Sequence, residues 1–200
     1  MKRMSRTMNA FRNFQILVRF RQDKRGVAAV EFAFIVPLML VLLFGMIDTS
    51  SGVAIDRKVT LTARTLSDLV SQGSKVTSTD ISNFFKMGSA VMTPYSVTPA
   101  TMTQKITQLA VDSSKKVKVV WSYSGSVSGN TVTVSAGYAK DTVVTTVPAN
   151  LLVANTYLIW SEVGYTYTPI TGYIMGKVGI PMSEETYTRP RQSDKVDYTS

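Results

Sequence analysis

Residues 27–47 read VAAVEFAFIVPLMLVLLFGMI, and this run decides the architecture of the chain. It is 21 residues long and contains a single charged side chain, Glu31. At 1.5 Å per residue, a helix of this length spans roughly 31 Å, about the hydrocarbon thickness of a bilayer. A buried helix of a soluble protein usually carries a polar stripe, and this run has none after Glu31. The pattern therefore predicts a transmembrane helix over residues 27–47.

A cleaved secretory signal is the other reading of this segment. The apolar core of such a signal is about 7–15 residues long, which is shorter than the run observed. A loose small-x-small site, Gly52-Val53-Ala54, follows Asp48 and lies beyond the apolar residues. Ordinary signal cleavage is therefore not expected.

The charges on the two sides of the segment orient it. The 200-residue chain has 22 Lys and Arg against 13 Asp and Glu, a net charge of +9. Residues 1–26 hold eight basic side chains and one acidic, which is +7, so residues 27–200 hold fourteen and twelve, which is +2. Positive flanks stay in the cytoplasm, so we expect a single-pass inner-membrane protein with residues 48–200 in the periplasm of a bacterium. The nearly neutral remainder offers no basic face, and no nucleic-acid partner is expected.

The composition also limits the chemistry. The chain has no Cys and no His, so it offers no disulfide, no thiol nucleophile, no Cys/His zinc site and no imidazole base. The segment Gly125-Ser126-Val127-Ser128-Gly129 has Val where a hydrolase elbow needs Ser. We expect no enzyme, no catalytic residue, no metal and no cofactor. Glu162 is the one carboxylate that stands out, and it is interpreted as a rim residue on the second face of a strand.

An apolar stripe predicts that the membrane helix continues beyond the bilayer. The stripe recurs at spacings of 4, 4, 3 and 4 and consists of Ile55, Val59, Ala63, Leu66 and Val70. Leu61 breaks this pattern, Pro37 is a candidate kink, and Gly73 is a candidate stop. One helix is thus expected from about residue 27 to residue 72. The stripe is most simply the surface on which the domain packs, with contact to neighbouring subunits as the alternative.

The rest of the chain predicts an α+β domain with a short helix and an antiparallel sheet. Ser78-Thr79-Asp80 supplies caps for a helix over residues 80–92. Alternating segments predict strands over residues 103–111, 115–122, 131–135, 142–147 and 156–167. We expect a hairpin loop over residues 124–130, and an edge strand or loop with a frayed tail over residues 183–200. The predicted organisation is a leader (1–26), a membrane helix (27–47), its amphipathic continuation (48–75) and a periplasmic domain (76–200).

The residues around Gly26 form a pattern of their own. Residues 24–32 read KRGVAAVEF, so a basic leader ends in Gly and Glu31-Phe32 follows at the head of the apolar helix. A carboxylate in an apolar span is costly and needs a partner or a purpose. By itself, Glu31 is equally explained as an interfacial residue near a helix N-terminus, where negative charge is favoured.

This pattern resembles the processing site of type IV prepilins and pseudopilins, and RGVAAVEFAFIVPLMLVLLFG resembles the TadE-like minor pseudopilins of tight adherence (Flp) pili. The resemblance implies cleavage by a prepilin peptidase between Gly26 and Val27. It also implies that Glu31, followed by Phe32, pairs with the free amino group of an adjacent subunit. Major Flp pilins are much shorter than this chain, which favours a minor, assembly-type subunit.

The resemblance implies a pilin-like fold and no catalytic activity. Its implied partners are the inner membrane, a prepilin peptidase, other pilins and pseudopilins, and platform proteins of pilus assembly. The subunit would assist or initiate assembly of the pilus and could enter it. The alternative is an uncleaved, single-pass anchored periplasmic binding or scaffold module, for which Gly26 and Glu31 are incidental.

Overall fold

The computed structural model describes residues 25–169, 171 and 179–199. All but the last two residues of the predicted leader, 1–26, lie outside this range. The chain divides into two units, one ending at Ile47 and the other beginning at Asp48.

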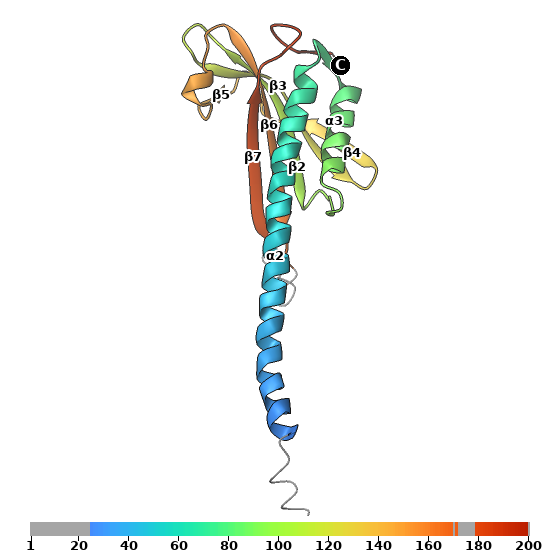
Figure 1. The fold of residues 1–200 in the computed structure, drawn as a ribbon. Coiled ribbons are helices and arrows are strands. Elements are labelled where there is room, and N and C mark those ends of the chain that lie inside the picture. Colours follow the sequence, from blue (N-terminus) through green and yellow to red (C-terminus); the bar gives the residue numbers. More distant parts are fainter. Residues whose placement is uncertain (1–24, 170, 172–178, 200) are drawn as a thin grey trace, which may run out of the picture. The chain divides into compact units, whose positions relative to one another are not determined.

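Helix α2 covers Arg25–Ser71 and is 47 residues long (Figure 1), so the predicted long helix is confirmed. In apolar surroundings only a helix satisfies every backbone N–H and C=O within its own segment, which suits the run over residues 27–47. Pro37 lies inside the helix. The helix ends where predicted, because the Gly73 N–H donates to the Val70 carbonyl at 3.2 Å and closes the last turn.

The part of α2 that belongs to the second unit buries the predicted apolar stripe. The five stripe side chains are each at most 1% exposed: Ile55, Val59, Ala63, Leu66 and Val70. Leu61, which broke the pattern, is 54% exposed and lies off the stripe. The stripe packs against the sheet core, so the simpler of its two explanations holds within this unit.

Helix α3 covers Ser78–Val91 and begins with a capping box. The Asp80 N–H donates to Thr77 Oγ1 at 3.2 Å, and the Thr77 N–H donates to Asp80 Oδ2 at 2.9 Å. The cap residue is therefore Thr77, one residue before the predicted caps. Ile81, Phe85 and Gly88 form the buried side of this helix.

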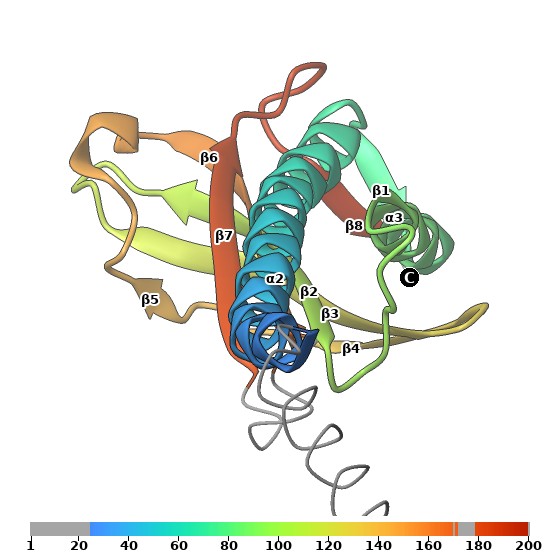
Figure 2. The ribbon, with the colours of Figure 1, turned by 60° about the horizontal axis from the view of Figure 1, so that its bottom comes forward.

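The main sheet is antiparallel, with strand order β4-β3-β2-β6-β7, and β5 pairs with the opposite end of β3 from β4. Its strands are β2 (Met102–Val111), β3 (Val117–Ser128), β4 (Thr131–Ala136), β5 (Val143–Val144), β6 (Thr156–Tyr167) and β7 (Ile180–Thr188). A 3-10 turn, η1 (Ala149–Leu151), lies between β5 and β6. Helices α2 and α3 lie on the same side of the sheet (Figure 2), here called the inner face. The predicted α+β fold class is confirmed.

Two strand predictions were wrong in extent. Strand β3 runs to Ser128, so the loop expected over residues 124–130 is a two-residue turn at Gly129-Asn130. Gly129 adopts a φ of 59°, which a tight hairpin turn requires and glycine allows. The strand expected over residues 142–147 is reduced to β5, which pairs only with Val117 and Lys118 of β3.

Both faces of the sheet carry a core. On the inner face, Ile159, Val163 and Tyr165 of β6 join the α2 stripe. On the outer face, Leu158 and Trp160 of the same strand form a second cluster with Val119 and Val147. Residues 137–155 lead from β4 to β6 and supply Val147, Leu151 and Leu152 to this cluster.

The end of the chain is not a frayed tail. Strand β8 (Asp197–Thr199) pairs in parallel with β1 (Lys75–Thr77). Val196 is fully buried, and Trp121 Nε1 donates to its carbonyl at 2.9 Å. The ring of Tyr198 lies 4.5 Å from that of Tyr123, centroid to centroid. Val196 and Tyr198 are therefore part of the inner core.

Candidate functional site

The residues singled out near the N-terminus lie in the first turns of α2. Gly26, Val27, Glu31 and Phe32 are all exposed, with Val27 at 59% and Phe32 at 68%. Residues four apart share a face of a helix, so Val27 and Glu31 lie on one side. Glu31 makes no hydrogen bond or ion pair with any other residue that the structure describes.

The fold itself does not require glycine at position 26. A Cβ built there would meet no heavy atom within 4 Å, and Gly26 lies within the regular helix. By contrast, a Cβ at Gly88 or Gly125 in the second unit would lie 2.3 Å and 2.2 Å from neighbouring atoms. Packing within this chain therefore explains Gly88 and Gly125 but gives no reason for Gly26.

Most of the large apolar side chains that follow are exposed, with fractions from 39% at Ile47 to 78% at Phe34, and Val36 and Phe44 are half-buried. Among the described residues, one helix is long and apolar enough to cross a membrane, and its most apolar window buries nothing inside the protein. An uninterrupted apolar surface of this size marks a membrane or protein contact. The N-terminal helix thus fits a membrane anchor.

Asp48, the first residue after this run, is held by the sheet of its own unit. Its Oδ2 accepts hydrogen bonds from Thr171 Oγ1 at 2.6 Å and from the Thr171 N–H at 3.1 Å. Tyr167 Oη at the end of β6 donates to Oδ1 at 3.3 Å. Burial, together with the negative charge of Asp48, raises the pKa of the Tyr167 hydroxyl. These contacts join the end of β6 to the first helical turn of the second unit.

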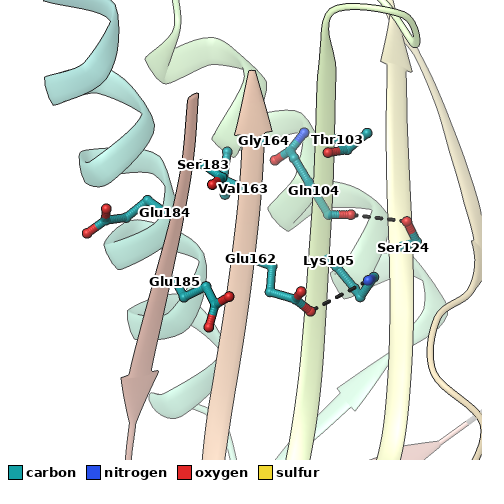
Figure 3. Close-up of a pocket in the computed structure, with 10 residues that line it drawn as sticks. All are labelled: Thr103, Gln104, Lys105, Ser124, Glu162, Val163, Gly164, Ser183, Glu184 and Glu185. Atoms are coloured by element: carbon teal, nitrogen blue, oxygen red, sulfur yellow. Dashed lines mark hydrogen bonds and ion pairs between the residues drawn. The ribbon is translucent and has the colours of Figure 1, made fainter. Parts of the chain in front are cut away.

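A second polar cluster lies on the outer face of the sheet (Figure 3). Lys105, Glu162 and Glu185 occupy neighbouring positions on β2, β6 and β7. Lys105 Nζ lies 3.6 Å from Glu162 Oε2, which is an ion pair but too long for a hydrogen bond. Tyr138 Oη donates to Glu162 Oε1 at 2.9 Å, and Lys105 Nζ lies 3.9 Å from the centre of the Tyr138 ring.

Burial dominates the electrostatics of Glu162. Its side chain is 21% exposed, and burial raises the pKa of its carboxyl above the ordinary value. The hydrogen bond from Tyr138 and the charge of Lys105 lower that pKa, while the charge of Glu185 raises it. Glu162 does lie on the second face of β6, as predicted, but it is a half-buried member of a network.

Through Tyr138, this network joins the segment of residues 137–155 to the outer face of the sheet. The ring of Tyr138 stacks on Trp160 at 5.4 Å, and Trp160 stacks on Tyr187 at 5.8 Å, centroid to centroid. Tyr138 and Lys105 lie 24 and 57 positions from Glu162, and only the tertiary fold brings the three side chains together. A local sequence pattern gives no signal for such a contact.

Beside the network is an open depression of about 340 Å³. Gly164 is one of its lining residues, and a Cβ there would lie 2.8 Å from Thr103 Oγ1. Ser124 and Ser183 also line it (Figure 3). Among the described residues, no group of three acidic side chains is arranged to hold a metal ion. Ser126 and Ser128 lie on β3 in a strand–turn–strand hairpin, whereas a hydrolase elbow is a strand-to-helix turn.

The chain combines an apolar N-terminal helix that fits a membrane anchor with an α+β domain, so its class is that of a membrane-anchored α+β protein. A family model described as TadE-like protein matches residues 26–66. Residues 26–66 are thus similar to TadE-like proteins, a family of tight adherence pilus components. The match spans most of α2 and leaves the sheet outside it. No curated protein and no solved structure matches the chain.

Proposed function

We propose that this protein is a minor pseudopilin that assists or initiates assembly of a tight adherence pilus and has no catalytic activity of its own. The observation that carries the proposal is the coincidence of three features in one segment. The TadE-like match begins at Gly26 and includes Glu31. The same segment contains the exposed apolar helix. A component that is inserted in the membrane and later packed among other helices needs these features together.

Gly26 supports processing because packing among the described residues does not account for a glycine there. The space around its Cα is open, so a need for glycine at this position would come from another molecule. A protease that holds an extended backbone closely favours a residue without a side chain at the cut. We propose that a prepilin peptidase is that molecule and that it cuts between Gly26 and Val27.

Glu31 supports assembly for a similar reason. It is exposed, lies in apolar surroundings and has no described partner within its own chain. Cleavage would free an α-amino group at Val27. An amino group and a carboxylate that are both costly in an apolar environment are stabilised when they pair. We propose that Glu31 of one subunit pairs with the amino group of Val27 on another, with Phe32 packing beside it.

The charge distribution supports the orientation. Removal of residues 1–26 would take away +7 of the net charge of +9, so the basicity serves topology and processing. The proposed partners are the inner membrane, the prepilin peptidase, other pilins and pseudopilins, and assembly-platform proteins. The organisation proposed is a cleaved leader (1–26), an anchor (27–47), an amphipathic continuation (48–75) and a periplasmic domain (76–200).

N-terminal sequencing and intact-mass analysis of protein extracted from membranes test the processing step. We expect a chain that begins at Val27 in cells with active prepilin peptidase. Gly26→Leu should block cleavage, whereas Gly45→Leu is a matched control, because a Cβ at Gly45 also meets nothing within 4 Å. A full-length wild-type chain in such cells would refute the pseudopilin proposal and favour the uncleaved anchored module.

Glu31→Gln tests the assembly step, because it removes the charge and keeps the shape of the side chain. We expect normal membrane insertion and processing but loss of piliation and surface adhesion. Val41→Ala, at a position that is 68% exposed on the same helix, is the control for a change of apolar surface. Normal piliation in the Glu31 variant would show that the pairing role is wrong.

A further inference from the structure

The sheet of the second unit has two edges, and they differ in chemistry. Strand β4 pairs only with β3, and β7 pairs only with β6, so each has one side without a strand partner among the described residues. The unpaired N–H and C=O groups of an edge strand are a template for another strand. Natural proteins usually block such edges with charges, proline or bulges.

The β7 edge carries these blocking features. Pro181 lacks an N–H, and Glu184 and Glu185 add two negative charges. If two β7 strands paired, acidic side chains of the two copies would lie near one another, which is destabilising. This edge is therefore protected against pairing with its own kind.

The β4 edge carries none of them. Strand β4 reads TVTVSA, and the whole stretch from Trp121 to Ala139 contains no charged residue and no proline. The register between β3 and β4 has no bulge. Val132 and Val134 pack against the inner core, while Thr131, Thr133 and Ser135 are exposed on the other side (Figure 2 shows this hairpin at the margin of the sheet).

We propose that the β4 edge binds the β4 strand of a second copy of this chain in antiparallel pairing, which joins the two sheets into one. An uncharged strand offers nothing to attract a charged partner, and pairing with itself desolvates no charge. Val would face Val on the inner side and hydroxyls would face hydroxyls on the outer side, which are favourable cross-strand pairs.

Geometry fixes the register of this pairing. Directly opposite residues of two strands point to the same face of a sheet, so the two numbers of each opposite pair must sum to an even value. The two-fold axis therefore lies midway between the two copies of one residue. With Thr133 at the centre, Thr133 faces itself, Thr131 faces Ser135 of the partner, and Val132 faces its Val134. This is the register in which hydroxyl side chains match along the whole outer side.

The pairing would be weak between free molecules because the strand is only six residues long. Two copies held in one membrane have a higher effective concentration, which favours a weak interface. The inference goes beyond the proposed function and does not depend on cleavage at Gly26. Failure of one therefore leaves the other standing.

Disulfide formation in the full-length chain in membranes tests the register. The chain has no Cys, so each single-Cys variant has one thiol, and opposite β carbons in antiparallel strands are close enough to bridge. We expect strong homodimers with Thr133→Cys, weak ones with Thr131→Cys or Ser135→Cys alone, and strong heterodimers when the last two are mixed. Ser183→Cys, an exposed β7 position, is the matched control and should give little dimer.

An edge-blocking variant tests the physical cause. Thr133→Lys places a charge at the centre of the pairing and should reduce the mixed Thr131→Cys/Ser135→Cys heterodimer at least about ten-fold, which corresponds to about 1.4 kcal/mol. Thr133→Ser should keep it. Dimer yields no higher than for Ser183→Cys would overturn the proposal. Equal homodimers at positions 131, 133 and 135 would also overturn it, because they indicate parallel strands.

Discussion

Gly88 provides a sharp test of how α3 packs, because two opposing effects act at one atom. In a helix, alanine is about 1 kcal/mol more favourable than glycine, so Gly88→Ala should stabilise an isolated α3. In the folded domain, however, the new Cβ would lie 2.3 Å from Gln104 Oε1, 3.1 Å from Leu66 Cδ2 and 3.2 Å from Thr62 Cγ2. Real Cβ atoms do not approach to 2.3 Å, so Gln104 must move.

Gln104 is not free to move without loss. It is 1% exposed, and its Nε2 donates to the Phe85 carbonyl at 3.1 Å. Displacing it forfeits about 1 kcal/mol of hydrogen bonding, and overpacking a core costs typically 1–3 kcal/mol. Set against the gain of about 1 kcal/mol in helix propensity, we expect Gly88→Ala to lower the free energy of unfolding by about 1–3 kcal/mol.

The assay is denaturant unfolding of the full-length chain in detergent, followed by tryptophan fluorescence. Both tryptophans of the chain, Trp121 and Trp160, lie in the sheet, so the signal reports on the domain that contains Gly88. Asn83→Ala, at an exposed position of α3, is the control for helix propensity alone and should be neutral or slightly stabilising.

A second background makes the reasoning falsifiable. In a Gln104→Ala chain the 2.3 Å contact disappears, and Gly88→Ala should then be neutral or stabilising by up to about 1 kcal/mol. The two substitutions should therefore be strongly coupled. If Gly88→Ala stabilises the wild-type chain as much as Asn83→Ala does, or if its effect is the same in both backgrounds, the packing described for α3 is wrong.

Three further outcomes are expected in the same assay. Because burial raises the folded-state pKa of Glu162, its contribution is fully present below the ordinary carboxyl pKa and is lost as pH rises through the raised value. Wild type should therefore lose stability relative to Glu162→Gln as pH rises above the ordinary carboxyl pKa of about 4; a constant difference would contradict this. Deletion of residues 196–200 removes the fully buried Val196 and the partner of Trp121 Nε1, and should lower the free energy of unfolding by at least about 2 kcal/mol. An unchanged free energy of unfolding would show that these residues are a frayed tail. Gly125→Ala places a Cβ 2.2 Å from the ring of Phe85 and should cost about 1–3 kcal/mol; partial rescue by Phe85→Leu is the check on its cause.

The helical part of the fold could be predicted because its signals are local. The spacing of the stripe from Ile55 to Val70 marks one face of a helix, and the structure buries all five of its side chains. Strands β2, β3, β4 and β6 could be located by alternation. Their ends were less certain, because a strand ends where its partner does, and the partner is not visible in a local pattern. This is why β3 is longer and β5 shorter than predicted.

The two candidate sites differ in how far they could be predicted from the sequence. Gly26, Val27, Glu31 and Phe32 were identified from a local pattern and its resemblance to prepilin processing sites, and the structure adds that packing among the described residues does not require Gly26. The surroundings of Glu162 could not be found from sequence. Lys105 comes from β2 and Tyr138 from the segment after β4, so the network exists only once three distant segments have been placed in register.

The sequence alone determined the apolar helix, its amphipathic continuation and the α+β class, since periodicity acts over neighbouring residues. Only the tertiary structure decided which strands meet, that the outer face has its own core, that the C-terminal residues are buried with Trp121, and that β4 is left as the unprotected edge. These features depend on contacts between residues far apart in the chain, and long-range pairing is chosen by the sum of all contacts rather than by any one segment.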